Sequence, residues 1–131
     1  MIDSSKQLLD GDDLRVILAD TVALLARHVE KVNSLNVFPV PDGDTGTNIL
    51  LTLQDISKSA SVVKSSSASD VSRAMAKGAL MGARGNSGVI LAQFFKGIAQ
   101  GLAQKYSFGA ADFAIALHTA SDQAMKAVSE P

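Results

Sequence analysis

The spacing of the hydrophobic residues constrains this chain most, because they recur every three or four positions and never alternate cleanly over four or more residues. A period of three to four places apolar side chains on one face of a helix, whereas a half-buried strand needs a period of two. The pattern therefore predicts an all-α fold.

The first predicted helix follows Asp12, a residue type that caps helix N-termini, and its apolar face continues without a break to Val32. A second helix is expected to begin near 45–47, and a third to cover about 70–80 with Ser67 or Ser69 as its cap. From Ser57 to Ser72, eight of sixteen residues are serine, which predicts a solvated connection. The first helix should bury a set of mainly apolar side chains: Leu14, Ile17, Leu18, Thr21, Leu24, Leu25, His28 and Val32.

A fourth helix is expected to begin near Ser87 and a fifth after Gly109. The fourth should bury Leu91, Phe94, Ile98 and Leu102. The fifth should bury Phe113, Leu117, Ala120, Ala124 and Val128. In the third helix, small residues recur every four positions, which would allow another backbone to approach closely: Ala74, Gly78 and Gly82.

The composition favours one domain with an aliphatic core. The 131 residues are 47% hydrophobic but only 5% aromatic, so Leu, Ile, Val and Ala must fill the interior. Twelve basic and thirteen acidic residues give a net charge of −1, which predicts no nucleic-acid partner. The chain has no cysteine and no apolar run long enough to cross a bilayer. We expect a soluble, cytoplasmic protein without a transmembrane segment.

The richest functional signal is segment 36–48, which reads NVFPVPDGDTGTN. Asp42 and Asp44 flank a glycine, and carboxylates this close repel each other unless a cation such as Mg²⁺ neutralises them. The amides, hydroxyls and dipole of a helix start form a site for anions, most commonly phosphate. The residues at this start are Thr45, Gly46, Thr47 and Asn48. The segment thus predicts a Mg²⁺–nucleotide site; the alternative is an Asx-turn with an N-cap and no ligand.

A second glycine-rich segment, 82–88, reads GARGNSG and also directly precedes a predicted helix. It matches neither the Walker A loop nor the dinucleotide-binding fingerprint. Arg84 is a candidate catalytic residue, since a guanidinium can neutralise charge on a transferring phosphoryl group. The candidate phosphate-binding residues are Gly85, Asn86, Ser87 and Gly88. The alternative is a helix–loop–helix corner with glycine caps.

If one anion bridges the two segments, both helix N-termini must face it. We therefore expect the two segments at the same end of the helices.

Together, NVFPVPDGDTGTN and KGALMGARGNSGVILAQFF resemble the ATP-binding (DhaL-like) domain of the bacterial fatty acid kinase A subunit. More distantly, they resemble the L subunit of the phosphotransferase-dependent dihydroxyacetone kinases. The resemblance implies an antiparallel barrel of about eight helices, with ATP and two Mg²⁺ ions held at one end. It places the metal-binding positions on Asp42 and Asp44, with a third near Asn36. It places phosphate contacts on Thr45, Thr47, Asn48 and on Asn86, Ser87 and Gly88.

The resemblance also implies an activity, which is transfer of the ATP γ-phosphoryl group to a fatty acid carboxylate presented by a fatty-acid-binding carrier protein. An anionic carboxylate needs no general base, and the two segments supply none. Two alternatives stay open. One is a dihydroxyacetone kinase subunit, which Asn36 in place of an aspartate disfavours. The other is a non-catalytic nucleotide-binding or helical interaction module.

The family domain is longer than this chain, so residues 1–131 are expected to form its N-terminal part, with about five helices. On this expectation the chain alone is catalytically inactive. The small-residue stripe of the third helix and the apolar face of the fifth would then be left open, and we expect the chain to associate with itself.

Overall fold

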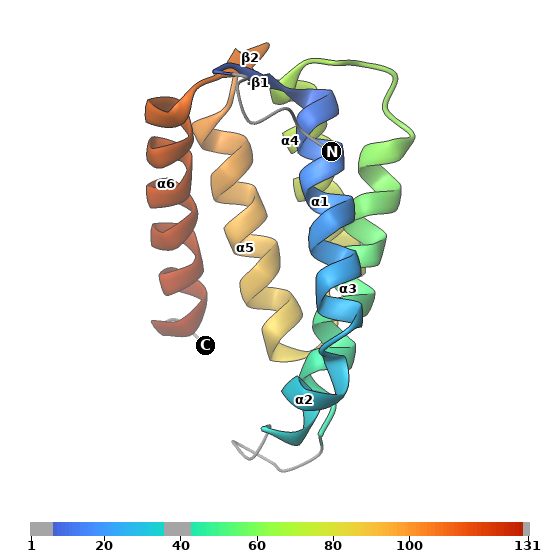
Figure 1. The fold of residues 1–131 in the computed structure, drawn as a ribbon. Helices are drawn as coiled ribbons and strands as arrows, with labels where there is room; N and C mark the ends of the chain where they lie inside the picture. The colour runs from blue at the N-terminus through green and yellow to red at the C-terminus, as the bar shows by residue number, and fades with distance from the viewer. Residues whose placement is uncertain (1–6, 36–42, 130–131) are drawn as a thin grey trace.

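The computed structural model describes residues 7–35 and 43–129. They form a bundle of helices with one short pair of strands at its upper end (Figure 1). In chain order the elements are β1 (Leu9–Asp10), α1 (Gly11–Ala26), α2 (Val29–Ser34), α3 (Thr45–Ser61), α4 (Ala68–Gly82), α5 (Gly85–Gly101), β2 (Ser107–Phe108) and α6 (Ala110–Ser129). The predicted all-α class is confirmed, and the extended structure within the described ranges is limited to β1 paired antiparallel with β2.

The long helices form a curved layer in which α3 packs on α4, α4 on α5 and α5 on α6. Helix α1 covers α3 and α4, and the short α2 lies against the start of α3 at the lower end (Figure 1). The core is mainly aliphatic, as expected, with fully buried Ile56, Val71 and Leu102, and the buried aromatic side chains among the described residues are Phe95 and Phe108. Across the described part of the chain, no helix has the length and apolarity that a membrane span requires.

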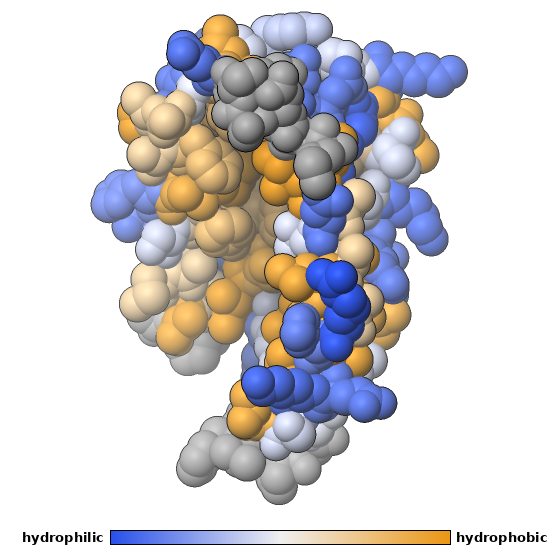
Figure 2. Space-filling model, viewed as in Figure 1, coloured by the Kyte–Doolittle hydropathy of each residue, from blue (hydrophilic) through white to orange (hydrophobic). Residues whose placement is uncertain are grey.

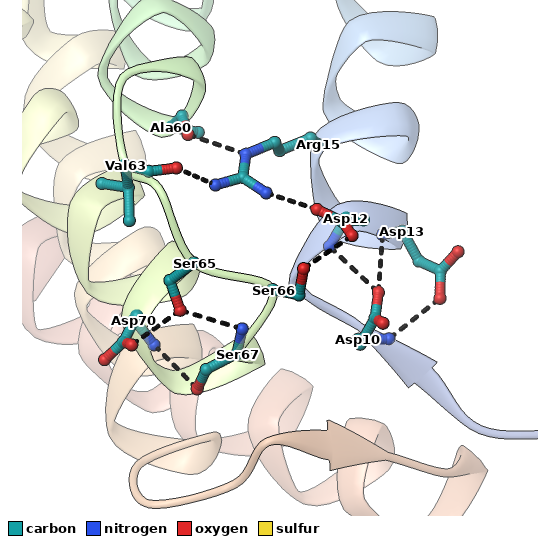
Figure 3. A network of polar contacts seen from close by, with 10 residues as sticks. All are labelled: Asp10, Asp12, Asp13, Arg15, Ala60, Val63, Ser65, Ser66, Ser67 and Asp70. Carbon is teal, nitrogen blue, oxygen red and sulfur yellow. Dashed lines mark hydrogen bonds and ion pairs between the residues drawn. The ribbon is translucent and has the colours of Figure 1, made fainter.

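Helix α1 begins two residues earlier than predicted, because Asp10 rather than Asp12 is its cap (Figure 3). The Asp10 carboxylate accepts the Asp12 and Asp13 amides, and Asp13 Oδ2 accepts the Asp10 amide at 2.9 Å, which completes a capping box. Pairing with β2 keeps Asp10 extended, so the helix can begin only at Gly11. Asp12 instead bonds Arg15 and Ser66.

The predicted continuous helix to Val32 is wrong. Helix α1 ends at Ala26, and the Arg27 and His28 amides close a tight turn onto the carbonyls of Leu24 and Leu25 before α2 begins. The structure buries Leu14 and Leu18 of the predicted face, whereas Ile17, Leu24 and His28 are exposed. Burial follows the line along which α1 meets α3 and α4, and that line is narrower than the apolar stripe in the sequence.

The serine-rich stretch is mostly ordered structure rather than a solvated connection. Helix α3 extends to Ser61 and α4 begins at Ala68, so only 62–67 connects them. Ser67 caps α4, as predicted, by accepting the Asp70 amide. Arg15 holds the end of α3 by donating from Nε to Ala60 O at 2.9 Å and from Nη2 to Val63 O (Figure 3). These contacts lie at the end of the bundle opposite to the glycine-rich segments.

The small-residue stripe of α4 is not left open. A Cβ atom at Gly78 would lie 2.5 Å from Ser59 Oγ, and one at Gly82 would lie 2.7 Å from Asp55 Cβ, so both glycines pack directly on α3. The expectation of an open surface there is wrong because the glycine-bearing half of α4 packs directly on α3.

Helix α6 approaches α5 through small residues. A Cβ at Gly97 would lie 2.4 Å from Ala120 Cα, and one at Gly101 would lie 2.5 Å from Ala116 Cα. This contact buries the alanines and leaves Leu117 40% and Val128 58% exposed, contrary to the predicted burial of both. Apolar side chains consequently line the hollow between α6 and α5 on one side and α1 on the other (Figure 2). Of the apolar face predicted for the last helix, Leu117 and Val128 are exposed, whereas Ala120 is fully buried against α5, so the expectation of an open face holds only in part.

Candidate functional site

The first glycine-rich segment leads into α3, which begins at Thr45 after Asp44 as the N-cap residue. Gly43 has a φ of +68°, a left-handed backbone that glycine adopts at little cost, and it turns the chain into the helix. The Asn48 amide donates to Asp44 O at 2.9 Å and closes the first turn. Asp44 is exposed at this terminus. Asp42 and Asn36, the other predicted metal-binding positions, lie outside the described residues.

Helix α2, which the sequence did not reveal, holds the first turn of α3. Asn33 Nδ2 donates to Thr47 Oγ1 at 3.0 Å, and the Thr47 amide donates to Asn33 Oδ1 at 3.1 Å. Gly46 is buried against the same helix, since a Cβ there would lie 2.7 Å from Val29 O. Because the Thr47 hydroxyl accepts from Asn33, its own proton remains available to an anion. The expected continuation of α1 hid the role of Asn33, and no sequence signal indicated it.

The second glycine-rich segment forms the corner between α4 and α5. Arg84 is the N-cap residue of α5, and Gly85 has a φ of +67°. Asn86 is exposed and Ser87 half-buried on the first turn, whereas Gly88 is buried against Ala83. The first-turn amides of this helix carry the partial positive charge that favours an anion.

The two segments meet, as predicted, at the lower end of the bundle, where α3 and α5 both begin (Figure 1). A Cβ atom at Gly85 would lie 2.8 Å from Asn48 Nδ2, so the side chain of one segment touches the backbone of the other. The structure therefore brings the start of α3, with Thr45 and Asn48, beside the start of α5.

Arg84, the candidate catalytic residue, forms a partly exposed ion pair at the lower end of the bundle. Its Nη1 lies 2.8 Å from Asp55 Oδ2 and donates to Gly82 O at 3.2 Å. The two side chains are 42% and 34% exposed. This geometry joins α3 to the corner before α5.

Two cavities adjoin the second segment. A cavity of about 750 Å³ lies between the first half of α5 and the end of α6, and its polar lining is Asn86, Gln93, Gln123 and Lys126. A smaller one of about 300 Å³ is lined by Ser87 and apolar side chains, including Ile49 and Phe94. Among the described residues no three His, Cys, Asp or Glu side chains cluster as a metal site.

The fold and site define a class, which is an α-helical domain whose two glycine-rich helix starts converge at one end. A family model, the DAK2 domain, matches residues 39–131, so both segments lie largely within the match. The chain belongs to the DAK2 domain family. This membership confirms the resemblance to the L-subunit-type domain of the dihydroxyacetone kinases and makes the chain a member of a kinase-related, nucleotide-binding family.

Relatives from bacteria support the assignment. Protein YloV of Bacillus subtilis is 41% identical over 127 residues, which is 97% of this chain and 23% of that protein. An uncharacterized protein of Staphylococcus saprophyticus is 39% identical over 123 residues, or 94% of this chain and 22% of its own length. An uncharacterized protein of Staphylococcus haemolyticus is 42% identical over 107 residues, which is 82% of this chain and 19% of that protein. The chain spans less than a quarter of the length of these relatives.

Proposed function

We propose that this chain is part of an ATP- and Mg²⁺-dependent phosphotransferase that phosphorylates a fatty acid carboxylate presented by a carrier protein. The observation that carries the proposal is the contact between Asn48 and Gly85, because it places two anion-binding helix starts side by side. A nucleotide with a chain of phosphates is the ligand that two such starts fit best.

Each residue has a proposed role. Asp42, Asp44 and Asn36 hold two Mg²⁺ ions, which neutralise charge on the nucleotide phosphates when bound. Oxygen donors are the ligands Mg²⁺ prefers, and Asp44 stands exposed at the helix start where these phosphates would lie. The phosphate-binding groups are those of Thr45, Gly46, Thr47, Asn48, Gly85, Asn86, Ser87 and Gly88.

Phosphoryl transfer depends mainly on positioning and charge neutralisation, and these residues supply both without an acid or base. Arg84 as a catalytic group stays a prediction. Its guanidinium faces Asp55 in this structure, so acting on a phosphoryl group would require exchanging that partner.

Calorimetric titration of the protein with ATP tests the nucleotide site. We expect saturable binding with Mg²⁺ and a large loss of affinity with EDTA. A titration without heat in the presence of Mg²⁺ contradicts the proposal. A phosphotransfer assay then separates the acceptors, and it uses the longer protein of which this chain is proposed to be part, because the chain alone is expected to be inactive. A fatty acid on its carrier protein should be phosphorylated, and dihydroxyacetone on its own carrier should not.

The dihydroxyacetone acceptor is the second candidate, and the DAK2 match favours it. Asn36 at the position of an aspartate in that branch disfavours it. Binding of ATP with transfer to neither acceptor indicates the non-catalytic module.

We also propose that the 131-residue chain associates with itself. The support is the exposure of apolar side chains on α6, where Ile115, Met125 and Val128 are each about 60% exposed. Light scattering after size-exclusion chromatography is expected to give a mass above that of one chain, and a monomer at every concentration contradicts this proposal.

A further inference from the structure

We propose that Thr52, together with Asp55, is a positioning residue that holds the second glycine-rich segment in register with the first. This inference rests on the proposed nucleotide site and adds to it the residues that set the spacing of its two halves. Asn48, Thr52 and Asp55 recur at i, i+4 and i+7, so they share one face of α3. That face is the one that meets the corner between α4 and α5.

The Thr52 hydroxyl is the centre of this contact. It is completely buried, donates to Asn48 O at 2.8 Å and accepts the Arg84 amide at 3.3 Å. A hydroxyl has one proton and two lone pairs, so it can fill both roles at once. One side chain thereby links the first turn of α3, through the Asn48 carbonyl, to the N-cap of α5.

The surrounding contacts leave the hydroxyl little freedom. A Cβ atom at Gly88 would lie 3.1 Å from Thr52 Oγ1, so the first turn of α5 packs directly on this side chain. One turn further along α3, Asp55 pairs with the Arg84 side chain at 2.8 Å. Arg84 is therefore held at its amide by Thr52 and at its guanidinium by Asp55.

These contacts matter for a ligand that touches both segments. Phosphate oxygens are recognised over hydrogen-bond distances, so a displacement of about 1 Å between two donor sets is enough to lower affinity strongly. Water cannot compete for the hydrogen bonds of the buried Thr52 hydroxyl. The half-exposed Asp55–Arg84 pair is screened by solvent and contributes less to holding the two segments together. We therefore expect Thr52 to dominate.

The experiment compares Thr52→Val, which keeps the shape and removes the hydroxyl, with Thr52→Ser, which keeps the hydroxyl. Thr21→Val is the matched control, because the Thr21 hydroxyl makes the same bond to the carbonyl four residues earlier, at 2.8 Å to Ile17 O, on an exposed face of α1. The affinity for Mg²⁺–ATP is measured by calorimetry, and exchange of the Arg84 amide proton by NMR.

We expect Thr52→Val to weaken Mg²⁺–ATP binding about tenfold, as loss of an outer-shell partner typically does, and to speed exchange of the Arg84 amide. Thr52→Ser should restore both, and Thr21→Val should change neither. Unchanged affinity in Thr52→Val, with tight binding by the wild type, overturns the positioning role alone. No binding by the wild type overturns the proposed function, and the inference falls with it.

If Thr52→Val does not fold, Asp55→Asn replaces it as the test. This variant removes the ion pair at the half-exposed position and is expected to weaken Mg²⁺–ATP binding by a smaller factor, about threefold, in line with the modest strength of exposed ion pairs. Full affinity in folded Asp55→Asn, with no faster exchange at Arg84, contradicts the inference.

Discussion

Replacement of Gly85 by alanine tests whether the two glycine-rich segments touch. Gly85 has a φ of +67°, a conformation that disfavours an alanine by about 1–2 kcal/mol. The new methyl group would also lie 2.8 Å from Asn48 Nδ2, although Asn48 Cγ and Cβ are 3.5 and 3.8 Å away. Only the amide tip must therefore move, at a cost of about 0.5–1.5 kcal/mol for leaving its rotamer. The expected loss of unfolding free energy is about 2 kcal/mol.

Gly43→Ala is the matched control for this prediction. Gly43 has nearly the same φ, +68°, but the nearest atom to its new methyl group would be Asn33 O at an ordinary 3.7 Å. Gly43→Ala should lower the unfolding free energy by about 1 kcal/mol, which is the cost of the left-handed backbone alone. Both values are measured by urea unfolding followed by far-UV circular dichroism. In an Asn48→Ala background, the loss of unfolding free energy caused by Gly85→Ala should fall to that caused by Gly43→Ala, because the Asn48 side chain no longer meets the new methyl group.

Two results would refute the reasoning. Equal losses in Gly85→Ala and Gly43→Ala would mean that Asn48 does not lie against the corner, so the two helix starts are not adjacent. No loss in Gly85→Ala would mean that the corner does not use a left-handed residue.

Three further predictions concern the site, the α5–α6 contact and acid stability. Asp42→Ala and Asp44→Ala should abolish Mg²⁺-dependent ATP binding in calorimetry while the circular dichroism stays unchanged; full affinity in both rules out the metal role. Gly97→Ala should lower unfolding free energy by about 1–3 kcal/mol, because the methyl group meets the backbone of α6, whereas an open helical glycine would gain from the change. The Gly109 amide, and then Lys105, hold the pKa of Asp112 below its ordinary value of 3.8, so its stabilisation is present above that pH and is lost as the pH falls through the lowered value. Asp112→Asn should therefore make unfolding free energy less sensitive to acid below pH 4, and an unchanged pH profile would refute this.

The sequence by itself determined the helical class and most helix starts. Apolar spacing is a local property, and so are the residue types that begin helices, which is why the start of α3 at Thr45 and the Ser67 cap were predictable. The meeting of the two glycine-rich segments was also predicted, from the hypothesis that one anion faces both helix starts.

Only the tertiary structure decided between residues that are locally equivalent, such as two possible helix caps or two possible buried faces of one helix. Asp10 and Asp12 are equally good caps by type, and pairing of β1 with β2 selects Asp10 by holding it extended. Because α6 approaches Gly97 closely, Ala116 and Ala120 are the side chains of α6 that become buried there, and Leu117 stays exposed. The contacts of Asn33 and Thr52 join residues 14 and 32 positions apart, and no local pattern encodes such separations. Periodicity reports which face of a helix is apolar, but the neighbour that covers it is set by packing across the whole chain.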